Sequence, residues 1–264
     1  MNKTDHTKDL DRVREELCKR EEADEMGDVE EACRPVVLFE QISREDFRTW
    51  IESHQDLDDF RFWDYEPLDA ETGRVVLYCF PFATQTFAVS EVISEIRSTI
   101  VRIGGDEELA ETMLTLPSPT LCFGNRLQIA DAALTPRRAV RRDLPNVVAH
   151  AAYTESWSHL ENKLRSYMIQ STSVQVAIGI KIFGSERQIM VFQRVDENTF
   201  YEDEFDLTGK EPGFISIPVR VLYRGGAIPT ALVGHESDEI QVDLARLRDV
   251  IDAFEDGLCR DLAA

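Results

Sequence analysis

Two polar residues stand where two apolar stretches of the sequence could present them to a common site. His150 lies within the stretch 147–153, and Lys181 ends the stretch 174–181. If both stretches are β-strands, each residue lies on one defined face of its strand. Gly179, two residues before Lys181 on the same face, leaves room for another group to approach. The alternative is that Lys181 lies where its strand enters solvent and that His150 is a hydrogen-bonded core residue.

The sequence from residue 144 to residue 183 predicts the elements that position these two residues. Two apolar runs flank a segment whose apolar residues recur at three- and four-residue steps along one side. These residues are Trp157, Leu160, Leu164, Tyr167 and Met168. A strand, a helix and a strand in this order normally give two parallel neighbours in a buried sheet. We therefore expect His150 and Lys181 on adjacent parallel strands.

Outside this unit, the patterns predict further strands and helices. Turn residues at 71–73 predict a hairpin, and the short runs 120–123 and 126–129 predict two strands joined by a two-residue turn. Apolar residues at helical spacing predict a long helix that ends at Gly104-Gly105. The other expected elements are an acidic helix at 106–116, a hairpin strand at 188–195, a solvated loop at 196–206, a strand at 215–223 and a closing helix after Asp243.

Length and composition predict one folded domain behind an acidic arm. The chain has 264 residues, of which 43% are hydrophobic, enough for a sizeable core. Residues 9–31 include eleven acidic and four basic residues. We expect residues 1–34 to form an acidic, flexible arm and residues 35–264 to form a single domain. The alternative for the arm, a transient helix, rests on a helical stripe of Leu10, Val13 and Leu17.

The charge balance limits the partners that the sequence allows. The 29 Lys and Arg residues and the 50 Asp and Glu residues leave a formal net charge of −21, which repels nucleic acid and anionic membranes at long range. Nucleic acid could bind only through one local basic cluster. The charge balance also allows basic proteins as partners. The cluster consists of Arg137, Arg138, Arg141 and Arg142. Its default interpretation is neutralisation by acidic residues of the same chain.

The cysteines and the apolar runs indicate a compartment. The five cysteines form no CxxC pair, which is typical of a reduced intracellular compartment, the cytoplasm or the nucleus. No apolar run reaches the length of a membrane span, and the N-terminus lacks the apolar core of a signal peptide. The glycines match no phosphate loop or dinucleotide fingerprint, and the cysteines and histidines do not have zinc-ligand spacing. We therefore expect an intracellular protein without a membrane segment and without a cofactor.

Short motifs give the chain a resemblance to a known family. They are Trp63-Asp64-Tyr65-Glu66 ahead of Thr72-Gly73-Arg74, then Leu144-Pro145-Asn146-Val147-Val148-Ala149-His150, Tyr153-Thr154-Glu155-Ser156 and Ile178-Gly179-Ile180-Lys181-Ile182. Their order resembles the Uma2-like branch of the PD-(D/E)XK restriction-endonuclease superfamily, in the version common among fungal hypothetical proteins. The resemblance covers roughly residues 61–182 and, more loosely, the C-terminal helix. It implies an α/β fold of restriction-endonuclease type, with a mixed central sheet flanked by helices.

The resemblance also implies a metal site made of two carboxylates and a lysine. In the family, the carboxylates hold Mg²⁺, which polarises the scissile phosphate and generates hydroxide. Lys181 matches the family's lysine, but Pro136-Arg137 occupies the place of its proline and acid, and His150 that of its glutamate. An arginine cannot bind Mg²⁺, and imidazole prefers softer metals. We therefore expect a catalytically degenerate nuclease fold, retained as a binding or interaction module and not as an enzyme.

Two alternatives remain open from the sequence. In the first, the chain is an active Mg²⁺-dependent nuclease in which displaced acidic residues act together with Lys181. The acidic residues in question are Glu66, Asp131 and Glu155. In the second, the chain is an acidic protein-interaction domain without nuclease ancestry, which binds basic partners.

Overall fold

The computed structural model divides the chain into two compact units. The described residues are 7–25, 34–53, 63–77, 83–124, 126–137, 145–152, 155–169, 172–182, 187–197, 199–209 and 212–261. The first unit comprises residues 1–81 and 120–129, and the second comprises residues 82–119 and 130–264. The chain therefore enters the second unit, returns to the first for one hairpin, and then completes the second.

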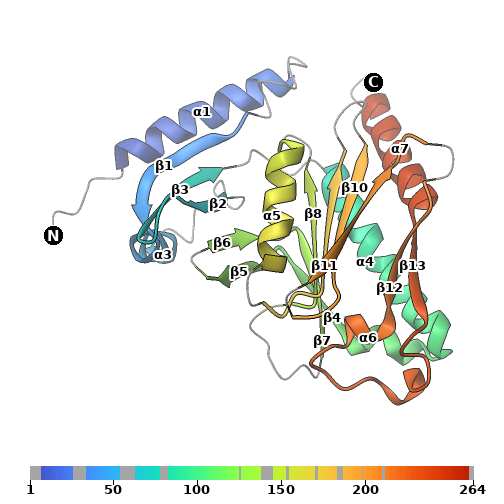
Figure 1. Ribbon diagram of the computed structural model, residues 1–264. Helices are drawn as coiled ribbons and strands as arrows, with labels where there is room; N and C mark the ends of the chain where they lie inside the picture. The colour runs from blue at the N-terminus through green and yellow to red at the C-terminus, as the bar shows by residue number, and fades with distance from the viewer. Residues whose placement is uncertain are drawn as a thin grey trace. The chain divides into compact units, whose positions relative to one another are not determined.

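The first unit is built on an antiparallel sheet of five strands in the order β1-β3-β2-β6-β5 (Figure 1). Its strands are β1 (Val36–Ser43), β2 (Trp63–Pro67), β3 (Thr72–Leu77), β5 (Thr120–Phe123) and β6 (Arg126–Ile129). Its helices are α1 (Thr7–Glu25) and α3 (Arg44–Ser53). The two short strands predicted at 120–123 and 126–129 are confirmed with those bounds.

The β2–β3 hairpin turns at Asp69, whose side chain closes the loop. Its Oδ1 accepts hydrogen bonds from the backbone N–H groups of Glu71 and Thr72, at 2.8 and 2.7 Å, and its Oδ2 accepts one from the Thr72 hydroxyl at 2.8 Å. These hydrogen bonds lower the pKa of the Asp69 carboxyl, because they stabilise its charged form. The hairpin predicted from the turn residues is confirmed.

Aromatic side chains form the core between α3 and the first sheet. The hydroxyl of Ser43 accepts a hydrogen bond from a backbone N–H in the first turn of α3, at 3.1 Å, and so caps the helix. Phe47 meets Trp63 edge to face, with ring centroids 4.8 Å apart, and Trp50 meets Phe39 at 5.3 Å. Edge-to-face contacts of this kind add to the stabilisation from burial alone.

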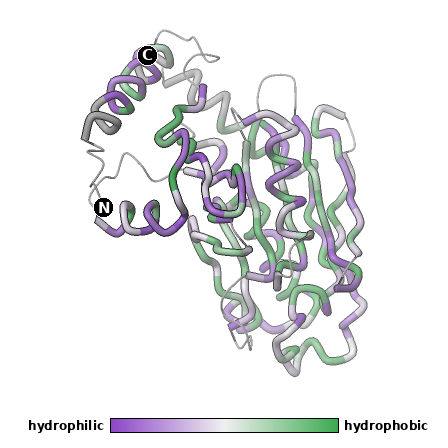
Figure 2. Tube along the Cα trace, turned by 60° about the vertical axis from the view of Figure 1, so that its left-hand side comes forward, coloured by the Kyte–Doolittle hydropathy of each residue, from purple (hydrophilic) through white to green (hydrophobic). Residues whose placement is uncertain are grey.

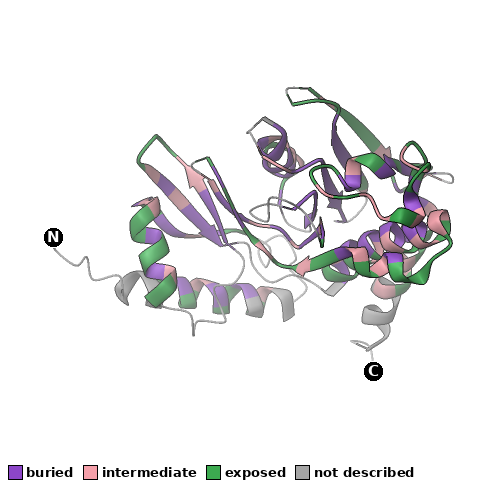
Figure 3. Cartoon of the chain, turned by 90° about the horizontal axis from the view of Figure 1, so that it is seen from below, coloured by how far each residue is buried: buried purple, intermediate pink, exposed green. Residues whose placement is uncertain are grey.

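Helix α1 packs along β1, within the stretch for which we expected a loosely attached arm (Figures 1 and 3). Val13 and Leu17 are buried in the core of the first unit. The Arg12 guanidinium donates a hydrogen bond to the backbone carbonyl of Val37, at 2.9 Å. Burial of this apolar stripe offsets the cost of ordering an acidic segment, so the helical alternative is the one observed for residues 7–25.

The second unit contains a mixed sheet of six strands in the order β11-β10-β9-β8-β7-β4 and a separate two-stranded hairpin, β12–β13. The pair β8–β9 is parallel, and the other neighbours in the six-stranded sheet are antiparallel. The strands are β4 (Met113–Pro117), β7 (Ala132–Pro136), β8 (Val147–Ala152), β9 (Val176–Lys181), β10 (Gln188–Arg194), β11 (Phe200–Asp206), β12 (Phe214–Pro218) and β13 (Glu239–Asp243). The helices are α4 (Ala83–Gly104), η2 (Glu107–Thr112), α5 (Trp157–Ile169), α6 (Val219–Leu222), η3 (Thr230–Leu232) and α7 (Leu244–Asp261).

Both faces of the six-stranded sheet are covered. On one face, apolar residues of β8 and β9, such as Ala149 and Ile178, share a core with α4, α7 and the β12–β13 hairpin. On the other face, α5 packs against β8, β9 and β10. In Figure 2, green marks the apolar stretches of these strands. The unit is a mixed α/β structure with helices flanking its sheet, as predicted.

Two expected elements are replaced by combinations of shorter ones. Residues 106–116, expected as one acidic helix, form η2 and then β4, because the backbone from Met113 onward pairs with β7. The alternating run 215–223 was expected as one strand, but β12 ends at Pro218 and α6 follows. Proline has no N–H to donate to a sheet, so the ladder ends where the proline stands.

The acidic stretch 196–206, expected as a solvated loop, contains the edge strand β11. Each of its residues from Phe200 to Asp206 is paired with a residue of β10. Most of its side chains are exposed (Figure 3), and four of them are acidic. The charge that suggested a loop is instead carried by the outermost strand of the sheet, where charged side chains are common.

We expected a single domain over residues 35–264. The chain is divided into two compact units, and the single domain remains a prediction. Among the described residues, no helix has both the length and the apolar character needed to cross a membrane.

Candidate functional site

The structure places His150 and Lys181 on the same face of two adjacent parallel strands. In the β8–β9 pair, His150 is opposite Gly179 and Lys181 is opposite Ala152. Directly paired residues point to the same side of a sheet, and so do residues two positions apart. The predicted parallel pairing is confirmed. It puts both polar side chains on the face that α5 covers.

Gly179 permits the close packing of α5 on this face. A methyl group at Gly179 would lie 2.5 Å from Leu164 Cδ1, which is closer than real carbon atoms approach, and 3.0 Å from Leu160 Cδ2, which is tight. The glycine therefore lets these leucines of α5 pack directly against the strand pair. The space expected beside Lys181 is filled by apolar side chains of α5.

His150 is held by a tyrosine of α5. Its Nε2 lies 3.1 Å from the hydroxyl oxygen of Tyr167, and the two rings stack with centroids 5.7 Å apart and planes 20° from parallel. His150 is 2% exposed and Tyr167 is fully buried. The arrangement corresponds to the sequence-based alternative in which His150 is a hydrogen-bonded core residue.

Lys181 is buried rather than at the point where its strand enters solvent. The residue is 5% exposed, and its Nζ donates a hydrogen bond to the backbone carbonyl of Glu155 at 2.6 Å. This bond joins the end of β9 to the segment that leads into α5. Lys181 thus fixes the backbone at the start of the helix.

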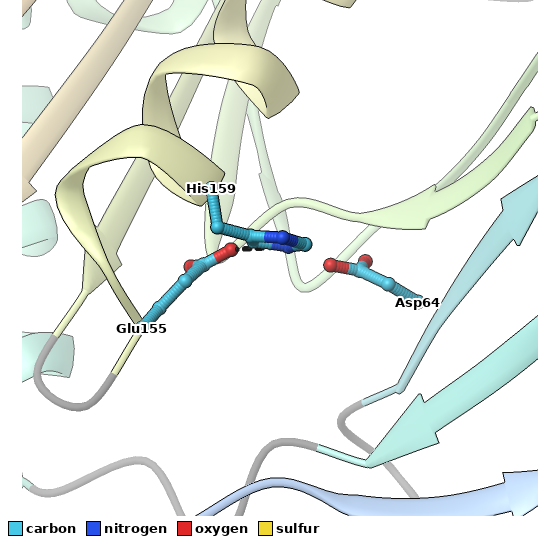
Figure 4. Close-up of side chains that lie close together, drawn as sticks. All are labelled: Asp64, Glu155 and His159. Atoms are coloured by element: carbon cyan, nitrogen blue, oxygen red, sulfur yellow. Dashed lines mark ion pairs between the residues drawn. The ribbon is translucent and has the colours of Figure 1, made fainter.

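Glu155 and His159 form an ion pair one helical turn apart (Figure 4). Glu155 Oε1 lies 2.7 Å from His159 Nε2. Glu155 is buried and His159 is partly exposed. Asp64, also drawn in Figure 4, belongs to β2 of the first unit.

Asp131 holds β8 on both sides of His150. Its carboxylate Oδ2 accepts a hydrogen bond from the backbone N–H of Ala151 at 2.7 Å, and its own N–H donates to the carbonyl of Ala149 at 3.1 Å. The second unit therefore gathers four of the predicted site residues, His150, Asp131, Lys181 and Glu155, around the C-terminal end of β8.

The remaining predicted residues lie elsewhere. Glu66 is in the first unit, where its Oε2 pairs with the Arg74 guanidinium. Arg137 is exposed and pairs with Glu111 at 3.0 Å, which agrees with neutralisation by an acid of the same chain. The other members of the basic cluster, Arg138, Arg141 and Arg142, lie outside the described residues.

Comparison with known proteins finds likeness among solved structures. No family model and no curated protein matches the chain. Among solved structures, the crystal structure of a putative nuclease belonging to DUF820 from Anabaena variabilis is similar over 80% of this chain and 99% of that one. The sequence identity is 12% and the TM-score is 0.46.

The donor set of the second unit does not fit a Mg²⁺ ion. Mg²⁺ requires near-octahedral coordination, with oxygen ligands at about 2.0–2.1 Å. One Asp131 oxygen already accepts a backbone N–H, and Glu155 Oε1 faces the ring of His159. His150 offers nitrogen in place of oxygen, and that nitrogen is at hydrogen-bonding distance from Tyr167. These contacts hold the side chains in place as structural groups.

The sequence analysis did not predict two side-chain contacts of the candidate site, those of Tyr167 and His159. Tyr167 was assigned only to the apolar side of its helix, and His159 was not among the candidate residues. Helical spacing put Tyr167 on the sheet-facing side of α5, where its hydroxyl lies beside His150 of β8. The i,i+4 spacing of Glu155 and His159 was the signal for the second contact.

Proposed function

We propose that the chain is a nuclease-fold protein that has lost two-carboxylate metal chemistry and serves as a binding or interaction module. The observation that carries this proposal is the buried contact between His150 and Tyr167. His150 occupies the place where the family resemblance puts a metal-binding glutamate. An imidazole stacked on a tyrosine in this place supports a packing role in the core.

The contacts of Lys181 support the same proposal. In the nuclease chemistry that the resemblance implies, the lysine steadies charge that develops on a phosphate. Here the Lys181 ammonium is 5% exposed and is bonded to the backbone carbonyl of Glu155. A phosphate would have to displace that carbonyl and open the packing of α5 to reach it.

A cleavage assay tests the proposal directly. The purified full chain is incubated with supercoiled plasmid DNA or with RNA in the presence of Mg²⁺ or Mn²⁺, and we expect both substrates to stay intact. Metal-dependent cleavage that disappears in Lys181→Ala would overturn the proposal. Lys19→Ala, which removes an exposed lysine of α1, serves as the matched control for contaminating nucleases.

Isothermal titration with Mg²⁺ tests the metal site without relying on activity. We expect no saturable binding at millimolar concentrations, because the second unit lacks a suitable oxygen cage. Saturable binding that Asp131→Asn or Glu155→Gln abolishes would instead support an active site made of displaced carboxylates. That alternative, a metal-dependent phosphodiesterase using Lys181, draws on the gathering of Asp131, Glu155 and Lys181 around the end of β8.

A protein partner of such a module would be basic. The chain has a net charge of −21, and β11 presents a row of exposed acidic side chains. Complementary charge speeds and orients association with a basic surface and discourages binding to nucleic acid. Arg137 does not alter this balance, because its charge is paired with Glu111.

A further inference from the structure

A pocket of about 740 Å³ in the second unit is rich in arginine, in contrast to the acidic character of the chain. Its lining residues come from β10, β11, the hairpin β12–β13, helix α6 and the residues just after β10 and α6. Its charged lining residues are Arg194, Arg220, Arg224 and Glu239. Three arginines and one glutamate leave two net positive charges. Pockets of this size hold small organic ligands.

Arg194 supplies a buried positive charge that is bonded only to neutral groups. It is 5% exposed, and its guanidinium donates to the backbone carbonyls of Val174, Glu197, Tyr167 and Met168 at 3.0–3.2 Å. Burial, together with the nearby charge of Arg224, lowers its pKa. Among the described residues no carboxylate is hydrogen-bonded to this buried cation, and only the charge of Asp196 acts to raise its pKa, so an anion is favoured in the adjoining space.

Arg220 and Arg224 have donors available for such an anion. Arg224 Nη1 donates to Gln175 Oε1 at 3.1 Å, which leaves most of its guanidinium donors unused among the described residues. The Arg220 side chain makes no hydrogen bond or ion pair within the described part of the chain. Two open guanidinium groups suit a tetrahedral oxyanion, because each can donate two parallel hydrogen bonds to it.

Gln193 is a second, independent feature of the pocket that indicates a ligand, because its side-chain oxygen needs a hydrogen-bond donor. This residue is 4% exposed, and its Oε1 is buried with no hydrogen-bond partner among the described residues. A buried carbonyl oxygen without a donor costs free energy, and such atoms are rare in folded proteins. A ligand with a hydroxyl or amino group next to its anionic group would satisfy this atom.

We propose that this arginine pocket binds a small organic phosphate, with the phosphate at Arg220 and Arg224 and a donor group of the organic part at Gln193. A phosphate monoester carries a charge of about −1.5 to −2 at neutral pH, which matches the two net positive charges of the pocket. Tyr201, Pro218 and Val221 supply an aromatic and apolar wall for the organic part. The site is independent of the proposed loss of nuclease chemistry.

Isothermal titration of the full chain with adenosine 5′-monophosphate, inorganic phosphate, adenosine and succinate tests the proposal. We expect the nucleotide to bind most tightly, free phosphate to bind less tightly, and adenosine and succinate to bind at least about tenfold more weakly than the nucleotide. Absence of binding by both phosphate compounds would overturn the proposal. Equal affinity for succinate and the nucleotide would overturn the assignment to phosphate, and equal affinity for free phosphate would overturn the role of the organic part.

Substitutions of the pocket residues then test whether the ligand binds in this pocket. The double variant Arg220→Gln/Arg224→Gln should weaken nucleotide binding at least about tenfold, since each charge-assisted contact contributes substantially. Arg48→Gln, which removes the charge of one exposed arginine of α3, should bind like the wild type. Gln193→Met should weaken the nucleotide about fivefold and leave free phosphate unchanged. Wild-type affinity in the double variant contradicts the proposal.

Discussion

The ring of His150 on β8 stacks on the ring of Tyr167 on α5, and their polar atoms lie 3.1 Å apart in the core of the second unit. The contact ties the crossover helix to the strand that it covers. It accounts for a histidine in a strand that is otherwise fully apolar. A side chain engaged in this way stabilises the fold, and its replacement can be measured as a change in stability.

Removal of the tyrosine hydroxyl should therefore destabilise the protein. Tyr167→Phe keeps the stacked ring but leaves the buried His150 nitrogen without this hydrogen bond, at a cost of about 1–3 kcal/mol in the free energy of unfolding. Urea denaturation followed by circular dichroism measures the change. Tyr201→Phe removes a phenol at a partly exposed position and should change stability by less than about 0.5 kcal/mol. Equal effects of the two changes would show that the His150 contact contributes nothing.

A methyl group at Gly179 should disturb the packing of α5. Gly179→Ala places a carbon 2.5 Å from Leu164 Cδ1, so the Leu164 side chain, the helix or the strand must move, at a cost of about 1–3 kcal/mol. The midpoint of thermal unfolding measures this loss. Gly209→Ala, whose added carbon would meet only the Asp206 carbonyl at 3.7 Å, is the matched control. If shortening the neighbouring side chain by Leu164→Ala does not recover part of the loss in Gly179→Ala, the steric explanation is wrong.

Truncation of a buried residue on α1 should loosen the helix from the first sheet. Val13 is fully buried, and Val13→Ala removes apolar contact worth about 1–2 kcal/mol. Amide hydrogen exchange of α1 should accelerate accordingly, about five- to thirtyfold if exchange reports this opening. Cys18→Ala, on the exposed side of the same helix, should leave exchange close to the wild-type rate. An unchanged rate in Val13→Ala would mean that α1 does not depend on this contact.

Alkaline pH should reduce stability through Tyr201. Burial, with smaller contributions from the charges of Asp203 and Glu239, raises the pKa of Tyr201 from 10.0 to about 12. The folded state therefore keeps this proton where the unfolded chain has lost it. The resulting stabilisation is fully present below pH 10 and is lost as the pH rises towards 12. Denaturation curves from pH 9 to pH 12 should fall less steeply in Tyr201→Phe, and parallel curves would contradict the assigned shift.

Local patterns predicted the elements around the candidate site well. The apolar runs and the helical spacing between them predicted β8, α5 and β9, and the short connection to β10 predicted a hairpin. Alternation alone put His150 and Lys181 on corresponding faces, which the strand register confirms. These inferences succeeded because burial on a sheet imposes a strict two-residue period.

Long-range contacts account for what the patterns missed. The acidic segment that forms β11 has no apolar alternation, and only pairing with β10 makes it a strand. Lys181 was expected either at a site or at the strand end, and its burial depends on a carbonyl 26 residues away. Neither the contact of His150 with Tyr167 nor the arginine pocket follows from spacing, since each combines residues from separate elements.

The acidic edge strand β11 also bears on how the protein behaves at high concentration. Its outer backbone groups could pair with another copy of the chain, but Glu202, Asp203, Glu204 and Asp206 charge that edge. Like charges on two approaching edges repel, so self-association is suppressed at neutral pH. High salt screens this repulsion, and edge-to-edge aggregation then becomes the main hazard in handling the protein.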